Sequence, residues 1–83
     1  KELYINQKKI RKKSAFIGFG NMKKSEFKNL SSKKNLKEAA SRLYYYFYLA
    51  DKNDSFETIS VAPIPNKGIG IAINDRLERA SKK

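Results

Sequence analysis

The chain has 83 residues, no cysteine and no histidine, and 19 lysine and arginine side chains against 8 acidic ones, a formal charge of +11. A chain of this length forms one domain with a small core. The missing residue types exclude disulfides, thiolate or imidazole metal ligands, and cysteine or histidine catalysis. The charge would attract nucleic acid or another anionic surface. Fifteen of the cations are lysine and 4 are arginine, which favours a solvated lysine surface over a dedicated nucleic-acid site.

The sequence has no apolar run long enough to span a membrane, and its first residues lack the apolar core of a signal peptide. We therefore expect a cytoplasmic protein without a membrane partner. The first residue is not methionine, so we expect residues 1–83 to be a single domain cut from a longer polypeptide, with a partner domain before it.

The first thirty residues predict three short strands. Residues 1–6 alternate loosely between polar and apolar side chains, residues 14–20 form an apolar run bounded by glycine, and residues 26–30 alternate with period two. Between the first two strands lies the basic connector, residues 7–13. Its cations form a candidate basic surface: Lys8, Lys9, Arg11, Lys12 and Lys13.

The middle of the chain predicts a helix. Asn35, followed three residues later by Glu38, resembles a capping box and marks the helix start. The polar segment 51–55 ends the helix, and the carboxylates of Asp51, Asp54 and Glu57 are interpreted as a solvated loop. Apolar residues recur at helical spacing and predict a stripe that faces the core: Leu36, Ala40, Leu43, Phe47 and Ala50.

Five consecutive aromatic residues, 44–48, lie on this helix and raise the alternative of base stacking. Consecutive helical side chains point about 100° apart, so they cannot form one platform. We predict that Tyr44 joins Phe47 in the core stripe, and that Tyr45 and Tyr48 cover its flanks.

Residues 56–62 alternate, are rich in β-branched side chains and predict a strand, which Pro63 and Pro65 end. A final helix follows at about residues 69–81. The order of elements predicts an α/β fold, an open sheet of about four strands with two main helices and at least one parallel crossover. The first connections are too short for helical crossovers. The first strands therefore either pair antiparallel at one edge or cross without regular structure.

Two glycines, Gly68 and Gly70, lie between the last strand and the last helix. Backbone N–H groups in this context can hold a phosphate. The third glycine of the dinucleotide fingerprint and the lysine-serine pair of a P-loop are both missing. A tight turn that lets the helix approach the sheet is therefore favoured over the candidate phosphate site.

The last helix carries a charged cluster of candidate interdomain contacts. Asp75 and Arg79 are spaced i and i+4, as in an ion pair on a helix surface. Alternatively, Arg76 or Arg79 reaches a neighbouring domain, because arginine suits interfacial ion pairs. The residue pattern leaves both possibilities open.

Three segments together resemble the C-terminal part of the two-domain form of L-threonylcarbamoyladenylate synthase. Residues 14–20 resemble its short strand ending in Phe-Gly, and residues 29–44 resemble its Asn-Leu-Ser and Leu-x-Glu-Ala-Ala pattern. Residues 63–80 resemble its Pro-Ile-Pro turn, glycine pair and Asp-Arg-Leu-x-Arg-Ala helix. One position departs, since Tyr48 stands where the family helix tends to have arginine.

The resemblance implies a C-terminal accessory domain of a larger enzyme, folded as a small Rossmann-like α/β unit. It would be inactive alone and without catalytic residues, metal ligands or a cofactor of its own. A YrdC-like catalytic domain would bind ATP with Mg²⁺, threonine and bicarbonate. As a nucleotidyltransferase it would form threonylcarbamoyl-AMP and pyrophosphate for the threonylcarbamoyladenosine modification of tRNA. The accessory domain would gate or support that reaction, help to retain the labile adenylate, or dock a tRNA-modifying transferase or tRNA. A stand-alone RNA-binding module and a protein-interaction module are the alternatives.

Overall fold

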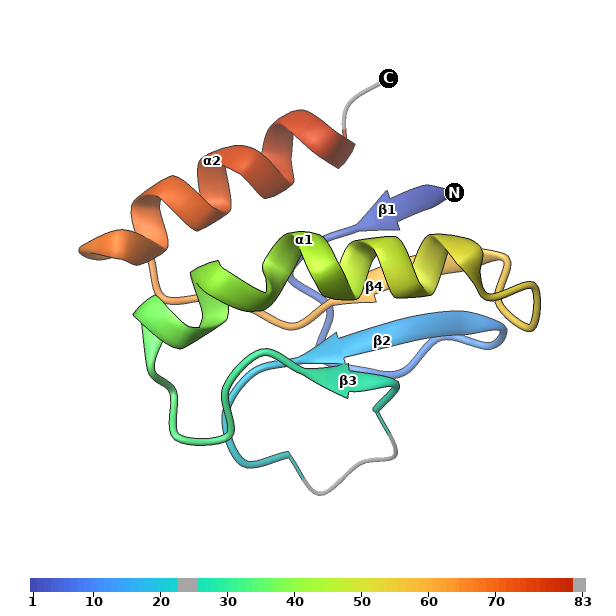
Figure 1. The fold of residues 1–83 in the computed structure, drawn as a ribbon, viewed down its shortest axis with the longest axis horizontal. Coiled ribbons are helices and arrows are strands. Elements are labelled where there is room, and N and C mark those ends of the chain that lie inside the picture. The colour runs from blue at the N-terminus through green and yellow to red at the C-terminus, as the bar shows by residue number, and fades with distance from the viewer. Residues whose placement is uncertain (23–25, 82–83) are drawn as a thin grey trace.

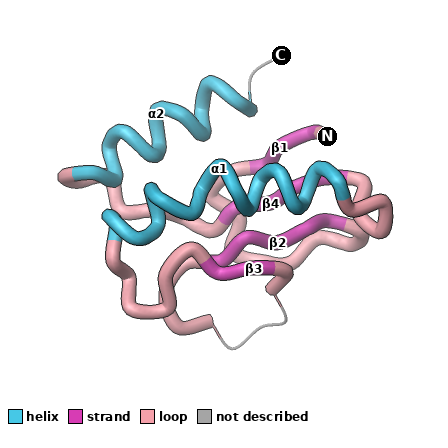
Figure 2. The backbone as a smooth tube through the Cα atoms, in the orientation of Figure 1, coloured by secondary structure: helices cyan, strands magenta, loops and turns pink. Residues whose placement is uncertain are grey.

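The computed structural model describes residues 1–22 and 26–81 of the chain. Strands β1 (Glu2–Tyr4), β2 (Ser14–Gly18) and β3 (Lys28–Asn29) precede helix α1 (Leu36–Lys52), strand β4 (Thr58–Val61) and helix α2 (Ile69–Ser81). The four described strands form one sheet in the order β1-β4-β2-β3, and each neighbouring pair is parallel. Figure 1 shows this arrangement and Figure 2 separates helices, strands and loops by colour. The predicted α/β fold with an open, Rossmann-like sheet is confirmed.

The parallel sheet decides between the two alternatives for the first strands. Strand β4 lies between β1 and β2, so the chain crosses from one to the other through residues that form neither helix nor strand. Antiparallel pairing at an edge is therefore wrong, and the irregular crossover is correct. Parallel strands need a crossover connection that returns the chain to the same end of the sheet, and the basic connector supplies it.

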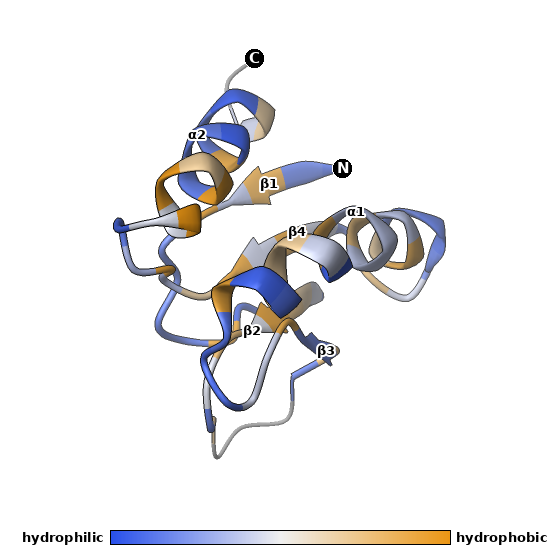
Figure 3. Ribbon diagram, turned by 60° about the vertical axis from the view of Figure 1, so that its left-hand side comes forward, coloured by the Kyte–Doolittle hydropathy of each residue, from blue (hydrophilic) through white to orange (hydrophobic). Residues whose placement is uncertain are grey.

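Helix α1 and the basic connector cover opposite faces of the sheet. The connector moves the chain from β1 past β4 to β2, whereas α1 moves it back from β3 past β2 to β4. Right-handed crossovers that run in opposite directions lie on opposite faces. In Figure 1, α1 crosses in front of the sheet and the connector passes behind it, and the turned view of Figure 3 agrees.

The strand register sorts the side chains between the two faces. Leu3, Ile59 and Ala15 are register partners, as are Tyr4, Ser60 and Phe16 on the alternate positions. The guanidinium of Arg11 in the connector lies 4.1 Å from the centroid of the Tyr4 ring, which assigns the Tyr4 set to the connector face. Strand β2 is buried along its whole length, because it has a neighbour on each side and a cover on each face.

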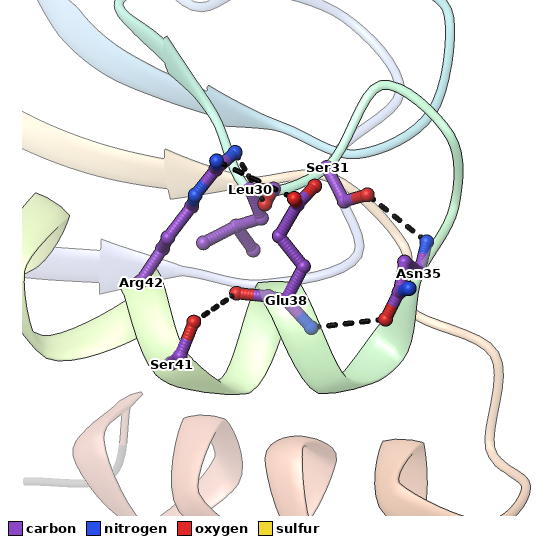
Figure 4. A network of polar contacts seen from close by, with 6 residues as sticks. All are labelled: Leu30, Ser31, Asn35, Glu38, Ser41 and Arg42. Carbon is purple, nitrogen blue, oxygen red and sulfur yellow. Dashed lines mark hydrogen bonds and ion pairs between the residues drawn. The ribbon is translucent and has the colours of Figure 1, made fainter.

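Of the two hydrogen bonds of the predicted capping box, helix α1 has the one from the Glu38 backbone N–H to the Asn35 side chain, whereas the Asn35 backbone N–H donates to Ser31 and not to Glu38 (Figure 4). The Glu38 amide donates to Asn35 Oδ1 at 3.0 Å, as predicted. The Asn35 amide donates to Ser31 Oγ at 3.0 Å, and the Glu38 carboxylate pairs with Arg42 at 3.4 Å. Arg42 also donates to the Leu30 carbonyl at 3.4 Å. Side-chain contacts thus hold the first turns of α1 to Leu30 and Ser31, which follow β3.

The predicted core stripe of α1 is confirmed for its five apolar residues, which are buried or packed against the core, but the addition of Tyr44 to it is wrong. Leu43 and Ala50 are buried and Phe47 packs against the core, but Tyr44 is 64% exposed and Ala39 is fully buried instead. The reason is that α1 packs against two neighbours, the sheet and α2, so its buried surface is wider than one stripe. Tyr44 lies at the outer border of the contact with α2. Tyr45 and Tyr48, which were predicted to cover the flanks of the stripe, are 61% and 58% exposed.

Helix α2 lies beside the β1 edge of the sheet and along part of α1, with the two helices meeting near their first turns (Figure 1). It buries Gly70, Ile73 and Leu77, spaced three and four residues apart, so one face of the helix enters the core. Within the described residues, no helix is long and apolar enough to cross a membrane.

Candidate functional site

The turn before α2 fixes where this helix begins. Gly68 has φ of +55° with open space around the position of a side chain, a left-handed conformation that favours glycine. At Gly70 a Cβ would lie 1.9 Å from the Pro65 carbonyl oxygen, so any side chain would force the backbone apart. Asn74 adds a hydrogen bond from its amide to the Ile64 carbonyl at 2.9 Å. The first turn of α2 is therefore packed directly on the proline turn.

Two backbone amides of this turn donate to carbonyls within it. Gly70 N donates to the Lys67 carbonyl at 2.9 Å, and Ile71 N donates to the Gly68 carbonyl at 3.2 Å. This geometry supports the tight-turn interpretation of the glycine pair. Phosphate binding at Gly68 and Gly70 stays a prediction.

An open groove runs between α1 and α2. It has a volume of about 630 Å³ and joins a smaller hollow of about 240 Å³ through shared lining residues. Its apolar floor and its polar rim come from both helices. The residues that line the larger part, which we call the α1–α2 groove, are Leu43, Tyr44, Phe47, Ala72, Asp75, Arg76, Arg79 and Ala80.

The three predicted interdomain residues all lie on the α2 side of this groove. Arg79 pairs with Asp75 at 3.1 Å, with side chains 80% and 55% exposed, as expected of a surface pair at i and i+4. Arg76 instead turns to α1, where its guanidinium lies 5.0 Å from the centroid of the Tyr44 ring. A cation over an aromatic face is attracted by the ring quadrupole. The rim of the groove is therefore ordered by contacts within the domain.

Sequence reasoning missed the α1 half of the groove, because Tyr44 was assigned to the core. One available signal was the phenolic hydroxyl, which needs a hydrogen-bond partner when it is buried. Another was the run of aromatic residues, which is too long for one helical stripe. The rings of Tyr44, Tyr45 and Tyr48 are all more than half exposed, and the Lys52 ammonium lies 5.6 Å from the centroid of the Tyr48 ring.

The basic connector forms a second candidate site on the other face of the sheet. Residues 8–13 are all exposed. Arg11 stacks on Tyr4, and the Lys13 ammonium lies 3.4 Å from the Glu57 carboxylate. The five cations predicted as a basic surface therefore lie on one continuous segment, separated by the sheet from α1.

A catalytic metal centre has no candidate in the described ranges 1–22 and 26–81, where no group of three or more His, Cys, Asp or Glu side chains could hold a metal ion. Asp51, Asp54 and Glu57 are exposed. On the described surface, two features remain as candidate binding sites, the α1–α2 groove and the basic connector.

The comparisons with known proteins gave one match. The sequence model of the family described as "Threonylcarbamoyl-AMP synthase, C-terminal domain" matches residues 1–82. No curated protein and no solved structure matched the chain. The family match covers nearly the whole chain, and it confirms the resemblance drawn from the strand, the helix and the proline-glycine motif.

Proposed function

Because this chain belongs to the family of C-terminal domains of threonylcarbamoyl-AMP synthase, we propose that it is an accessory domain that docks on the catalytic domain of that enzyme through the α1–α2 groove. A protein that carries such a domain is an enzyme of tRNA modification. In the proposed division of work, a YrdC-like catalytic domain binds ATP with Mg²⁺, threonine and bicarbonate and releases pyrophosphate. The accessory domain gates or supports that reaction.

One observation carries the choice of surface: the α1–α2 groove combines an open apolar floor with a rim of tyrosine and arginine. These two residue types are enriched at protein interfaces and among the residues that dominate binding energy. Arg76 already lies over the ring of Tyr44 in the free domain. Groups that are ordered before binding lose less side-chain entropy on association.

Docking at this groove would support the chemistry by excluding water. Threonylcarbamoyl-AMP is a reactive adenylate, and closure of a site protects reactive intermediates from hydrolysis. The exposed Ile69 at the start of α2 lines the smaller hollow and extends the apolar surface of the groove, and Ile71 on the same turn is also exposed. Their burial against a partner would add to the driving force in proportion to the apolar area removed from water.

The docking surface is tested by a matched pair of variants, Tyr44→Ser and Tyr45→Ser. The two residues are adjacent on α1 and similarly exposed, 64% and 61%, but Tyr45 is not among the groove-lining residues. With the catalytic domain supplied as a separate protein and binding measured by calorimetry, Tyr44→Ser weakens docking about tenfold or more. Tyr45→Ser changes it less than about threefold, because the same exchange is made outside the groove.

Activity provides the second measurement. Threonylcarbamoyl-AMP is quantified from ATP, threonine and bicarbonate, using the catalytic domain with and without this chain. We expect no product from this chain alone, and a higher retained yield when both are present. Equal docking by the two tyrosine variants would overturn the groove as the docking surface, and product formed by this chain alone would overturn its accessory role.

A further inference from the structure

We propose that the basic connector, residues 7–13, binds the phosphate backbone of RNA. The connector lies on the face of the sheet away from α1 (Figure 1), so RNA bound there leaves the α1–α2 groove open. The proposal therefore stands or fails separately from docking at the groove.

Charge density is the first argument. Five of the six residues from 8 to 13 are cationic, and all six are exposed. The ion pair between Lys13 and Glu57 joins side chains that are 62% and 65% exposed, and such pairs contribute little and are screened by salt. Like charges on so short a segment repel one another. An anionic polymer relieves this repulsion while it releases its own counterions.

The connector is also held in place before any ligand arrives. Gln7 N donates to the Val61 carbonyl at 2.9 Å, and Glu57 N donates to the Lys13 carbonyl at 2.7 Å, so both ends are bonded to the β4 region. Ser14 N, at the start of β2, donates to the Arg11 carbonyl at 3.2 Å. Arg11 is anchored on the ring of Tyr4. A pre-ordered array of cations loses less entropy on binding than a free loop.

The lack of a helix and the single exposed apolar side chain of the connector favour RNA over an anionic membrane. Four of the five cations are lysine, which makes point contacts to phosphates, and phosphate contacts carry no sequence information. Stable binding to a membrane surface adds an amphipathic helix or a lipid anchor, which inserts apolar groups, to a cluster of cations. The connector has no helix and offers one apolar side chain, Ile10, which is 40% exposed. RNA is also the substrate class of tRNA modification.

The test compares two triple variants of this 83-residue chain that remove the same charge from different places. Lys8→Gln, Lys9→Gln and Lys12→Gln neutralise the connector. Lys33→Gln, Lys37→Gln and Lys67→Gln neutralise exposed lysines outside it. Both triples lower the formal charge from +11 to +8. Binding to an unmodified tRNA transcript and to a uridine oligonucleotide is measured by fluorescence anisotropy across a series of salt concentrations.

We expect the connector triple to weaken RNA binding about tenfold or more at low salt and to reduce the slope of log K against log salt by about 2 to 3, because each lost phosphate contact removes about 0.7 to 0.9. The matched triple changes affinity about twofold. Equal losses from both triples would show that net charge, not the connector, attracts RNA. Absence of RNA binding by the unaltered chain, or stronger binding to phosphatidylserine vesicles than to tRNA, would also overturn the proposal. Circular dichroism of both triples verifies that each remains folded.

Discussion

The α1–α2 groove and the basic connector present different chemistry on two faces of one small sheet. The groove is built by two packed helices, and its arginines are oriented by contacts to Tyr44 and Asp75. The connector is irregular chain held by backbone hydrogen bonds, and lysine provides most of its charge. Planar arginine suits directed contacts at an interface, whereas lysine suits salt-dependent contact with phosphate. The comparison indicates that the cations behind the net charge of +11 serve different kinds of contact in the two regions.

The largest effect on stability is expected at Gly70, where α2, one wall of the groove, packs against the proline turn. Gly70→Ala places a Cβ against the Pro65 carbonyl and should lower the free energy of unfolding by about 3 kcal/mol or more. Gly68→Ala is the matched control. Its Cβ meets open space at a positive φ, so we expect a cost of about 1 kcal/mol. Urea unfolding measures both, and similar costs would contradict the close packing of α2 on the proline turn.

Gly70→Ala also separates the two regions if it is studied at a temperature where the variant stays folded. Displacement of α2 disturbs the groove, whereas the connector is bonded to the β4 region. Docking on the catalytic domain should therefore be lost while salt-dependent RNA binding is kept. Parallel loss of both activities in the folded variant would mean that the two regions are not independent.

An intermediate effect is expected on the connector face of the sheet. Ser14 and Ser60 are buried, and their hydroxyl oxygens lie 2.6 Å apart. Ser60→Ala leaves the Ser14 hydroxyl without this partner and should cost about 1 to 2 kcal/mol. The double variant Ser14→Ala with Ser60→Ala should cost less than the sum of the single changes, because no buried hydroxyl is left unpaired. Thermal unfolding of the three variants measures this, and additive costs would argue against the hydrogen bond.

The smallest effect on stability is expected at the groove rim. Asp75→Asn removes the exposed ion pair with Arg79 and should change the free energy of unfolding by less than about 0.5 kcal/mol. It also raises the positive charge of the rim, so the affinity for the catalytic domain should change in a salt-dependent manner. Chemical denaturation and docking calorimetry measure the two quantities. A loss of stability above about 1 kcal/mol would mean that Asp75 has a structural role beyond an exposed pair.

Much of the local structure was predictable from sequence. The bounds of α2, the start of α1 at Asn35 and the position of each strand follow from periodicity, capping residues and proline, although each strand is shorter than predicted. Asp75, Arg76 and Arg79 share one helix, as predicted, whereas their role as interdomain contacts stays a prediction. Tyr44 was misplaced, because helical spacing alone does not show how far a second helix covers the first.

The sequence by itself determined the order of elements, the turn that requires glycine, the family and the charge of the connector, because each follows from residue types and their spacing along the chain. Only the tertiary structure decided that all neighbouring strands are parallel, that the connector and α1 cover opposite faces, and that Arg76 meets Tyr44 at the rim of a groove. These features depend on contacts between distant residues, such as the hydrogen bond from Glu57 N to the Lys13 carbonyl. The energies of such contacts are set by packing and not by local preference.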